Sequence, residues 1–418
     1  MVQPDSSMEA GGRTGWYHGW NIVAVCVLAG IAASALPINA FSLFLKDWSK
    51  DLGIPVSTLQ LGLAGVGIGS ALLSPLAGIL ADKWSSRRLF AIGLGTLALF
   101  CLGIGFMTET WHYMLLYALP LPIAIVLSTS VPANAVVSRW FVRRLGLALA
   151  VTAVGLGMAG VIMPPLVAAI MPDVGWRAIW RAAGIVIAVV VLPLVLFVLR
   201  DRPSERDGSH YLAGRQPADA QGGGGTIGLR WRDIFSRRNF WLLVIVYLPM
   251  IALYGGVGQN LAPIAAARGL SQQTAGALLS AFSLSQVIAT LLAGALSDRF
   301  GNRMPLAAFA LATALGGVVV TFSDSVAGLG LGVVLAAVGG SFWPLLAAAI
   351  ATEFGAGGTG RAFGLVTFFL PATALAPFAI ARSQETSGDY TAALLTMAGL
   401  AMAGGLLCGL LMRERARR

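Results

Sequence analysis

The chain carries an internal repeat at half its length. The segment "LAGILADKW" at residues 76–84 returns as "LAGALSDRF" at residues 292–300, 216 positions later. The same register pairs Gly53 with Gly269 and Thr58 with Thr274 without a gap. A duplication of this kind builds two similar halves that lie side by side. Because each copy closes a long apolar run, the repeat predicts two similar halves embedded in a membrane.

Apolar runs long enough to cross a bilayer fill most of the sequence. Hydrophobic residues make up 57% of the chain, and charged residues only 11%, about half the share in a soluble protein. A spanning helix needs ~20 mostly apolar residues. That length predicts twelve spans, at 20–44, 57–81, 88–107, 112–137, 145–170, 178–199, 239–262, 274–297, 304–322, 327–351, 361–382 and 390–411. The first run has full spanning length, so we expect it to be retained rather than cleaved as a signal peptide.

The basic residues indicate the orientation. If both termini are cytoplasmic, the inner loops and tails hold 22 of the 28 Lys and Arg residues. The outer loops hold the other six, which are Lys46, Lys50, Arg177, Arg181, Arg268 and Arg382. Positive charge collects on the cytoplasmic side of membrane proteins, and there it faces anionic lipid. This split explains the net charge of +10 without nucleic acid as a partner, and a bacterial inner membrane is the expected location.

A polar connector divides the chain. Residues 200–238 contain Pro203, Pro217 and four consecutive glycines, a composition typical of a flexible linker. The predicted domains are therefore an N-terminal six-helix bundle at 1–199, a cytoplasmic linker at 200–238 and a C-terminal six-helix bundle at 239–418. The end of the linker, residues 230–238, is compatible with a short helix on the membrane surface, and residues 203–228 are compatible with a solvated linker.

The sequence offers no constellation for catalysis or metal binding. The three cysteines, Cys26, Cys101 and Cys408, lie in apolar runs without pairing or metal-ligand spacing. The three histidines lie at helix ends or in the linker, and no nucleotide-binding G-x-x-x-x-G-K-[ST] motif occurs. We therefore expect neither an enzyme nor a cofactor.

Both copies of the repeat lead into a recognisable motif. "GILADKWSSRR" at residues 78–88 and "GALSDRFGNR" at residues 294–303 resemble the loop 2–3 signature of the major facilitator superfamily, G-x-L-a-D-r-x-G-r-k. The second copy fits slightly better, because the first has Ser85 where the pattern has Gly. The resemblance implies an all-α membrane protein whose two pseudo-symmetric six-helix bundles enclose a midplane cavity that opens to each side in turn. It also implies a secondary transporter that works as a monomer in the lipid bilayer on a small-molecule substrate, with a co-transported proton as an open question.

The resemblance implies a cytoplasmic gate at the same motif. Asp82 and Asp298 would each lie beside the start of a helix in the opposite half. A carboxylate beside a helix N-terminus gains roughly 0.3–1 kcal/mol. With the arginines that can pair there, the expected gating residues are Asp82, Arg87, Arg88, Asp298, Arg303 and Arg361. The alternative is that these loops only set the topology.

The predicted membrane core contains no ionisable residue at its midplane. Polar and aromatic side chains that should face the bundle interior are Asn39, Ser130, Asn134, Tyr247, Tyr254, Gln259, Gln286, Trp343 and Phe368. As a set they suit a flat, weakly charged or aromatic solute held by stacking and neutral hydrogen bonds. The alternative for each is a hydrogen bond between helices, worth ~0.6 kcal/mol on average. Only Arg181 and Arg382 could supply a cation to the outer half of the cavity.

Finer similarity bears on the substrate. "YHGW" at residues 17–20, "RWFVRRLGLALA" at 139–150 and "GWRAIW" at 175–180 are similar to bacterial monocarboxylate-transporter-type and oxalate/formate-type members. This similarity favours a small organic or aromatic acid. The uncharged core favours a neutral heteroaromatic metabolite, such as a riboflavin-like vitamin, and drug efflux is a third interpretation.

Overall fold

The computed structural model describes residues 17–141, 144–201, 203, 231–354, 362, 364–366 and 368–412, without the side chains of Asp82, Ser130, Val131, Leu156, Trp231, Asp298 and Ala351. Throughout these residues the chain is helical or forms turns, and they contain no strand. Eleven segments within them are long and apolar enough to cross a membrane. The prediction of an all-helical membrane protein is confirmed at this level.

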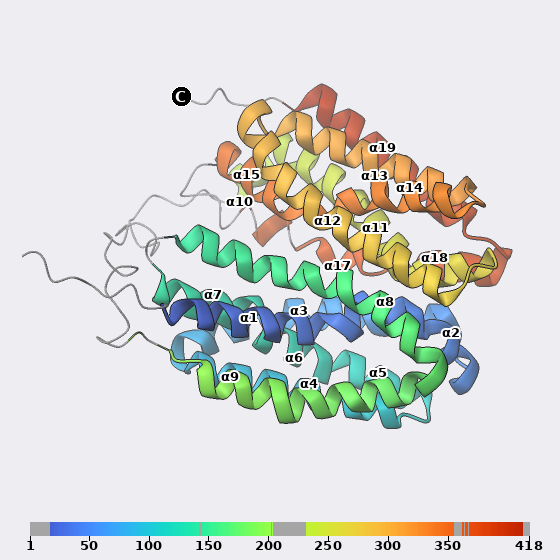
Figure 1. Ribbon diagram of the computed structural model, residues 1–418. Helices are drawn as coiled ribbons and strands as arrows, with labels where there is room; N and C mark the ends of the chain where they lie inside the picture. The colour runs from blue at the N-terminus through green and yellow to red at the C-terminus, as the bar shows by residue number, and fades with distance from the viewer. Residues whose placement is uncertain are drawn as a thin grey trace, which may run out of the picture.

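The helices form two groups, which Figure 1 shows one above the other. The N-terminal half contains α1 (Gly19–Ser34), a π-helical turn (Ala35–Asn39), α2 (Phe41–Leu52), α3 (Val56–Lys83), α4 (Ser86–Phe106), α5 (Thr110–Ala118), α6 (Pro120–Ser128), α7 (Ser130–Trp140), α8 (Leu145–Val186), a second π-helical turn (Ile187–Val191) and α9 (Leu192–Val198). The C-terminal half contains α10 (Trp231–Phe235), α11 (Arg238–Ala267), α12 (Gln272–Phe300), α13 (Arg303–Phe322), α14 (Val326–Ala337), a 3-10 turn (Val338–Ser341), α15 (Phe342–Phe354), α17 (Leu370–Thr373), α18 (Ala376–Ser387) and α19 (Thr391–Leu411). Most of the predicted linker lies outside the described residues, so its limits stay a prediction, although α10 is a short helix within 230–238.

One long helical segment with a kink covers two of the predicted spans. The sequence predicted a break between residues 170 and 178, and the structure has a kink there at a single non-helical residue, Gly175, at φ 74°. Glycine adopts this left-handed backbone without a Cβ clash, so the chain bends within one residue rather than in a loop. The whole segment, Leu145–Val198, has 54 residues, which is long enough for two spans. Figure 1 shows the bend of α8.

The repeat is visible in how the helices end. Gly53 follows α2 at φ 66°, and its repeat partner Gly269 lies in the turn between α11 and α12 at φ 73°. Both positions need a residue without Cβ, because the backbone is left-handed there. The duplicated glycines therefore close equivalent helices in the two halves.

The fourth span of each half is broken. In the N-terminal half, α5 stops at Ala118, and Pro120 opens α6. Proline lacks the N–H that would continue the helical hydrogen bonds, so the break falls there. In the C-terminal half, the 3-10 turn Val338–Ser341 separates α14 from α15. Breaks of this kind bring backbone and small residues close to the interior of the bundle.

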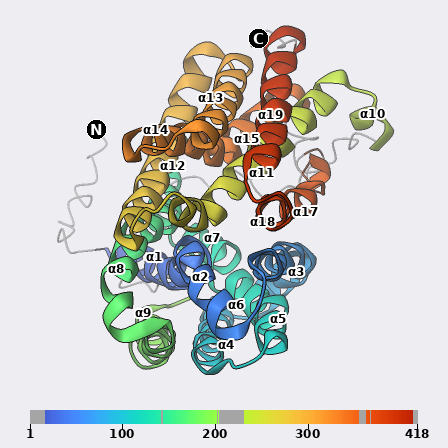
Figure 2. The same ribbon diagram turned by 90° about the vertical axis from the view of Figure 1, so that its right-hand side faces the viewer.

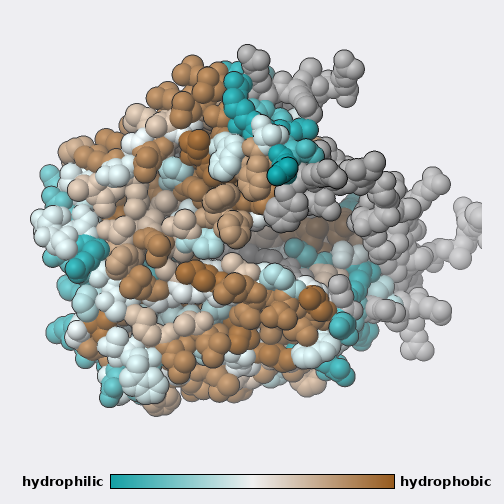
Figure 3. Space-filling model, turned by 180° about the vertical axis from the view of Figure 1, so that it is seen from behind, coloured by the Kyte–Doolittle hydropathy of each residue, from teal (hydrophilic) through white to brown (hydrophobic). Residues whose placement is uncertain are grey.

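The outside of the molecule is apolar. Large side chains such as Phe197 (83% exposed) and Leu410 (75% exposed) point away from both bundles. Figure 3 shows that apolar residues cover much of the visible surface between the more polar ends. Exposed apolar surface on this scale needs a lipid environment.

The two bundles meet along two seams, and Figure 2 views them from one end. We call the end where α2 and α18 finish the distal end, and the end where α3 and α9 finish the linker end. In the first seam, α8 packs along α12, and in the second, α3 packs along α18, while α2 also packs on α11. A Cβ added at Gly157 would lie 2.5 Å from Val287, and one at Gly276 would lie 2.9 Å from the carbonyl oxygen of Pro164. Missing side chains therefore let α8 and α12 approach closely.

Candidate functional site

A cavity of about 530 Å³ lies between the two bundles. Its described lining comes from α1, the adjoining π-helical turn and α8 on one side, and from α11, α12, the 3-10 turn and the start of α15 on the other. These residues are Ser34, Ile38, Asn39, Ala150, Ala153, Val154, Gly157, Tyr254, Gln286, Val287, Thr290, Leu291, Gly340, Trp343 and Pro344. Figure 3 shows a hollow between the bundles toward the linker end. A cavity of this size suits a small organic molecule.

Tyr254 and Gln286 form the polar centre of the cavity. The Tyr254 hydroxyl donates a hydrogen bond to Oε1 of Gln286 across 2.8 Å, which joins α11 to α12. The Tyr254 ring stacks on Phe282, with 5.0 Å between ring centroids. In the described part of the chain, no hydrogen bond uses the amide nitrogen of Gln286, so this group can donate to a ligand.

Gly340 makes room for this pair. A Cβ at position 340 would lie 2.6 Å from the Tyr254 ring and 2.7 Å from Cγ of Gln286. A residue other than glycine at position 340 would push the side chain of Tyr254 or Gln286 aside. The sequence analysis missed Gly340, because nothing in its local pattern distinguishes it from the many other glycines of the chain.

Asn39 lies at the boundary between this cavity and a smaller one. The smaller cavity, of about 120 Å³, shares Ile38, Asn39 and Tyr254 with the larger one and extends to Gln259 and Ser283. Asn39 donates from Nδ2 to the carbonyl oxygen of Ser34 across 3.0 Å. This bond closes the π-helical turn, so the local backbone fixes the amide at the cavity wall.

The remaining predicted binding residues lie elsewhere. Asn134 lines a separate space of about 120 Å³ within the N-terminal half. Tyr247 is buried in the C-terminal half against Phe342, although it shares a face of α11 with Tyr254, because side chains fill the bundle at its level. Phe368 is 76% exposed and packs on Phe369. The side chain of Ser130 lies outside the described residues.

The described lining of the cavity is neutral. Arg181 packs inside the N-terminal half, where it donates to the carbonyl oxygen of Gly105 and lies over the Phe106 ring. Arg382 lies at the distal end, 3.5 Å from the carboxylate of Glu385. Neither of these predicted cations lines the cavity.

The predicted gating residues are only partly described. Arg361 and the side chains of Asp82 and Asp298 lie outside the described residues. Arg87 and Arg88 are exposed at the start of α4. Arg303 donates from Nε to the carbonyl oxygen of Gly409 on α19, within its own half. The gate at the linker end therefore stays a prediction.

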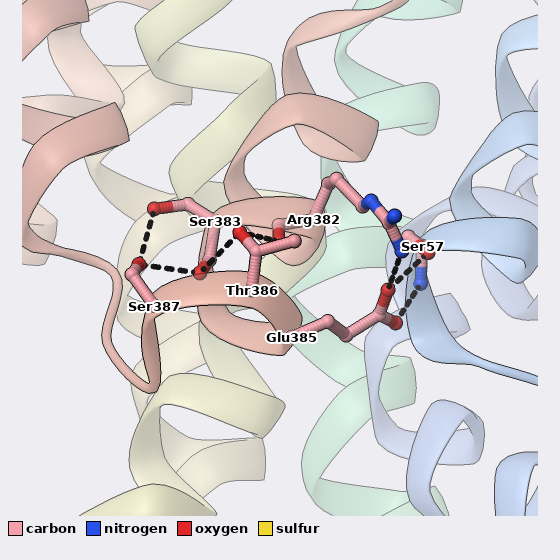
Figure 4. Close-up of polar contacts among 6 residues, drawn as sticks. All are labelled: Ser57, Arg382, Ser383, Glu385, Thr386 and Ser387. Carbon is pink, nitrogen blue, oxygen red and sulfur yellow. Dashed lines mark hydrogen bonds and ion pairs between the residues drawn. The ribbon is translucent and has the colours of Figure 1, made fainter.

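Hydrogen bonds close the distal end between the halves. The Gln60 amide on α3 donates to the backbone carbonyl of Gln259 (3.0 Å) and to Oδ1 of Asn260 (3.2 Å), both on α11. Glu385 accepts two hydrogen bonds from Ser57, as Figure 4 shows. Sequence reasoning missed Ser57, Gln60 and Glu385, since pairs separated by 199 to 328 positions leave no local signal.

Acidic residues also lie at the distal end of α2. Burial and the neighbouring charge of Asp51 raise the pKa of Asp47, which lines a space of about 140 Å³ between α2 and the α11–α12 turn. The pKa of Asp51 is lowered, first by a hydrogen bond from Nε1 of Trp176 and then by Arg177, which lies 2.8 Å away. The pair formed by Asp51 and Arg177 ties α2 to α8 within one half.

Comparison with known proteins extends these observations. The profile of the Major Facilitator Superfamily matches residues 26–271 and 255–418. The chain is 26% identical over 360 residues to human monocarboxylate transporter 11, covering 80% of this chain and 70% of that protein. It is 31% identical over 176 residues to the riboflavin transporter RibJ of Trypanosoma cruzi, covering 40% of this chain and 36% of that protein.

The fold has counterparts among solved structures. A bacterial homologue of the human lysosomal transporter Spinster, in an inward-facing and unoccupied conformation, matches with a TM-score of 0.68 at 13% sequence identity. The match covers 96% of each chain. At this identity the likeness shows the fold alone.

Proposed function

Because the chain belongs to the Major Facilitator Superfamily, we propose that it is a secondary transporter that moves a small organic solute by alternating access. One observation carries this proposal: a cavity between the halves, with hydrogen bonds closing its distal end. Motion of one half against the other would open that end and close the linker end. Transport of this kind needs no chemical step and no cofactor.

The substrate class follows from the relatives and from the cavity wall. The monocarboxylate transporter relatives favour a small organic acid, especially an aromatic one, as the leading candidate. A carboxylate without a partner in a low-dielectric cavity costs several kcal/mol, and about 1.4 kcal/mol is worth a decade of affinity. Since the described lining is neutral, we propose that an acid binds with its own proton.

A neutral heteroaromatic metabolite is the second candidate. Tyr254, Gln286 and Trp343 offer stacking surface and neutral hydrogen bonds, which suit such a solute without any protonation step. The partial similarity to a riboflavin transporter is consistent with this class. Drug efflux stays a third interpretation, which no residue of the described cavity lining favours.

Exchange in proteoliposomes tests the proposal. Purified protein would be reconstituted with a panel of aromatic acids and neutral heteroaromatics, and uptake of each labelled solute would be measured with and without the same solute inside. We expect saturable uptake that the internal solute accelerates.

Tyr254→Ala and Trp343→Ala should each weaken apparent affinity about tenfold, which corresponds to the loss of ~1.4 kcal/mol of stacking and burial. Phe368→Ala is the matched aromatic control and should leave it unchanged. Absence of exchange for every solute would overturn the transporter proposal.

Substitution of Arg181 tests whether the substrate is instead an anion that pairs with this arginine. Because its guanidinium is engaged with Gly105 and Phe106 away from the cavity, Arg181→Gln should leave apparent affinity unchanged within about twofold. Loss of acid transport in this variant would mean that the arginine reaches an anionic substrate in another state.

We also propose twelve spans with both termini cytoplasmic, in a bacterial inner membrane. The bend in α8 supports the division of residues 145–198 into two spans, and the basic residues support the orientation. The distal end is then the outer end. Cysteines placed at Asp324 and Gln384 should react with an impermeant thiol reagent in intact cells, whereas one at Gly222 or Arg415 should not. Reaction at Gly222→Cys would reverse the orientation.

Gating at the cytoplasmic end is proposed for Asp82 and Asp298, with Arg87, Arg88, Arg303 and Arg361 as basic partners. The repeated position of the two aspartates, at the ends of α3 and α12, supports this role. Asp82→Asn and Asp298→Asn should slow exchange far more than they weaken binding. Reduced affinity with an unchanged maximal rate would exclude the role.

A further inference from the structure

A space of about 120 Å³ lies in the N-terminal half beside the large cavity, and we call it the N-terminal cavity. Ala153 on α8 lines both of them. On α1, Gly30 of the N-terminal cavity lies one turn from Ser34 of the large one, and the Ser34 hydroxyl donates to the Gly30 carbonyl oxygen across 2.8 Å. A molecule in the large cavity can therefore extend a substituent of a few heavy atoms into the N-terminal cavity.

A break between α6 and α7 forms one wall of the N-terminal cavity. Thr129 lies in this break, at φ −119° and ψ −127°. The hydroxyls of Ser128 and Thr129 donate to carbonyl oxygens four residues earlier in α6. Side chains that bond to the preceding turn bend a helix, and Pro132 in the first turn of α7 has no N–H to continue the hydrogen bonds of α6. The local sequence therefore breaks the helix at Thr129 and places its side chain in the wall.

Asn134 on α7 contributes a side-chain amide to the same wall. The residue is exposed, and among the described residues no hydrogen bond involves its side chain. A polar group without a partner is costly inside a membrane protein. The alternative role that the sequence left open for Asn134, a hydrogen bond between helices, does not occur among the described residues. Both ends of the amide can therefore bond to a ligand.

The hydrogen-bonding groups of this wall select what can bind there. The Thr129 hydroxyl donates to the carbonyl oxygen of Ile125 across 2.7 Å, and that of Thr152 to Ala148 across 2.9 Å. Because their protons are engaged, the two hydroxyl oxygens offer acceptors, while Asn134 offers one acceptor and two N–H donors. An ionised carboxylate can only accept, so its charge would lie against acceptor oxygens. A protonated carboxyl or a carboxamide both donates and accepts, so it satisfies the wall.

We propose that the N-terminal cavity is the subsite for a neutral planar group that both donates and accepts a hydrogen bond, either the protonated carboxyl of an acid or a carboxamide. This inference deepens the proposed transport function and rests on it. The carbonyl oxygen of the group accepts from Nδ2 of Asn134, and its O–H or N–H donates to Oδ1 of Asn134 or to a threonine oxygen. The ring of the same molecule lies in the large cavity, where Tyr254 and Trp343 offer stacking surface.

The first test uses the charge of the ligand. Binding of benzoic acid, benzamide and methyl benzoate to the purified protein in detergent would be measured by ligand-detected NMR, with empty micelles as the blank. Above the pKa of a free carboxylic acid, about 4, its neutral fraction falls about tenfold for each pH unit. The apparent affinity for benzoic acid should therefore weaken about tenfold from about pH 6 to about pH 7, while that for benzamide stays constant. Cys26 is the one ionisable residue in the described lining, and a thiol keeps its proton over this range.

The second test removes the polar groups of the wall. Asn134→Leu should weaken benzamide binding about tenfold, equivalent to ~1.4 kcal/mol. Methyl benzoate cannot donate a hydrogen bond, so it should lose less than about threefold. Thr152→Val removes one acceptor and should weaken benzamide binding about threefold. Thr396→Val is its matched control, because Thr396 makes the same kind of bond to the preceding turn of α19 but is exposed and does not line this cavity.

Three results would overturn the subsite. They are the absence of benzamide binding to the parent, an affinity for benzoic acid that does not follow pH, and equal effects of Asn134→Leu on benzamide and methyl benzoate. Thermal unfolding checks that each variant is folded, and Thr152→Val decides the question if Asn134→Leu does not fold. None of these measurements uses transport, so the subsite and the exchange predicted above fail separately.

Discussion

The two seams between the halves differ in what holds them together. Along α8 and α12 the contact is made by missing side chains: Gly157 and Gly276 allow close approach. Along α3, at the distal end, it is made by hydrogen bonds from Ser57 and Gln60 to the other half. The first seam is mainly a packed surface, in which Ser280 donates to the carbonyl oxygen of Val161 across 2.6 Å and Gln272 donates to the sulfur of Met171 across 3.1 Å. The second seam is held at the distal end by charged and neutral side chains that bond across it.

This difference separates two tasks in a rocking motion. A surface of small residues can tilt while it stays in contact, because few directional bonds must break. Hydrogen bonds fix one relative position and are lost together when the ends part. We therefore interpret the α8–α12 seam as the pivot and the α3 contacts of Ser57 and Gln60 as the latch that closes the distal end.

The largest expected effect comes from filling the packed seam. In Gly276→Val, the new Cβ would lie 2.7 Å from Ala168 and 2.9 Å from the Pro164 carbonyl oxygen, so α8 and α12 must separate. Overpacking of this kind costs about 1–3 kcal/mol. We expect a lower thermal midpoint. Gly255→Cys, in a background without the three native cysteines, places a thiol in the smaller cavity between the halves and should react strongly with an impermeant maleimide from outside. Gly294→Val, also on α12, is the control, because a Cβ there meets nothing within 4 Å. Equal behaviour of the two variants would contradict the pivot.

A smaller effect is expected from the neutral part of the latch. Gln60→Leu removes both hydrogen bonds from its amide nitrogen to α11, at about 0.5–1.5 kcal/mol each. The loss is partly offset, because Oε1 of Gln60 is buried without a described partner in the parent. Outer labelling of Gly255→Cys should rise several-fold. Gln273→Leu, an exposed glutamine at the same end, serves as the reference. If both leucine variants label alike, Gln60 does not hold the latch.

The smallest effect is expected at Asp51, which ties elements within one half. The folded pKa of Asp51 is lowered, so its stabilising contribution is present above the ordinary aspartate pKa and is lost as pH falls through the lowered value. Because the pair with Arg177 is over a third exposed, Asp51→Asn should cost only ~0.2–1 kcal/mol at neutral pH. Thermal unfolding in detergent should show the two proteins converging in acid, while Gly255→Cys labelling stays unchanged. A change in labelling would place Asp51 in the latch.

Sequence reasoning was strongest where the repeat and local chemistry agree. The family prediction from the two loop motifs is confirmed by the profile match over both halves. The structure gathers Asn39, Tyr254, Gln286 and Trp343 around one cavity, as expected of polar and aromatic residues in a membrane interior. It sets Tyr247 apart from them, because helical periodicity gives the face of a helix but not what fills the bundle at each level.

The sequence by itself determined that the chain forms apolar helices, that these helices need a membrane environment, and that the two halves are duplicated. These depend on apolar run length, on glycine at left-handed positions such as Gly53 and Gly269, and on charge in the loops, all of which act locally. Only the tertiary structure decided that Glu385 meets Ser57, 328 positions away, and that Gly340 lies under Tyr254. Such contacts depend on how two bundles are placed against each other. That placement is a sum over many packed side chains, which no short stretch of sequence contains.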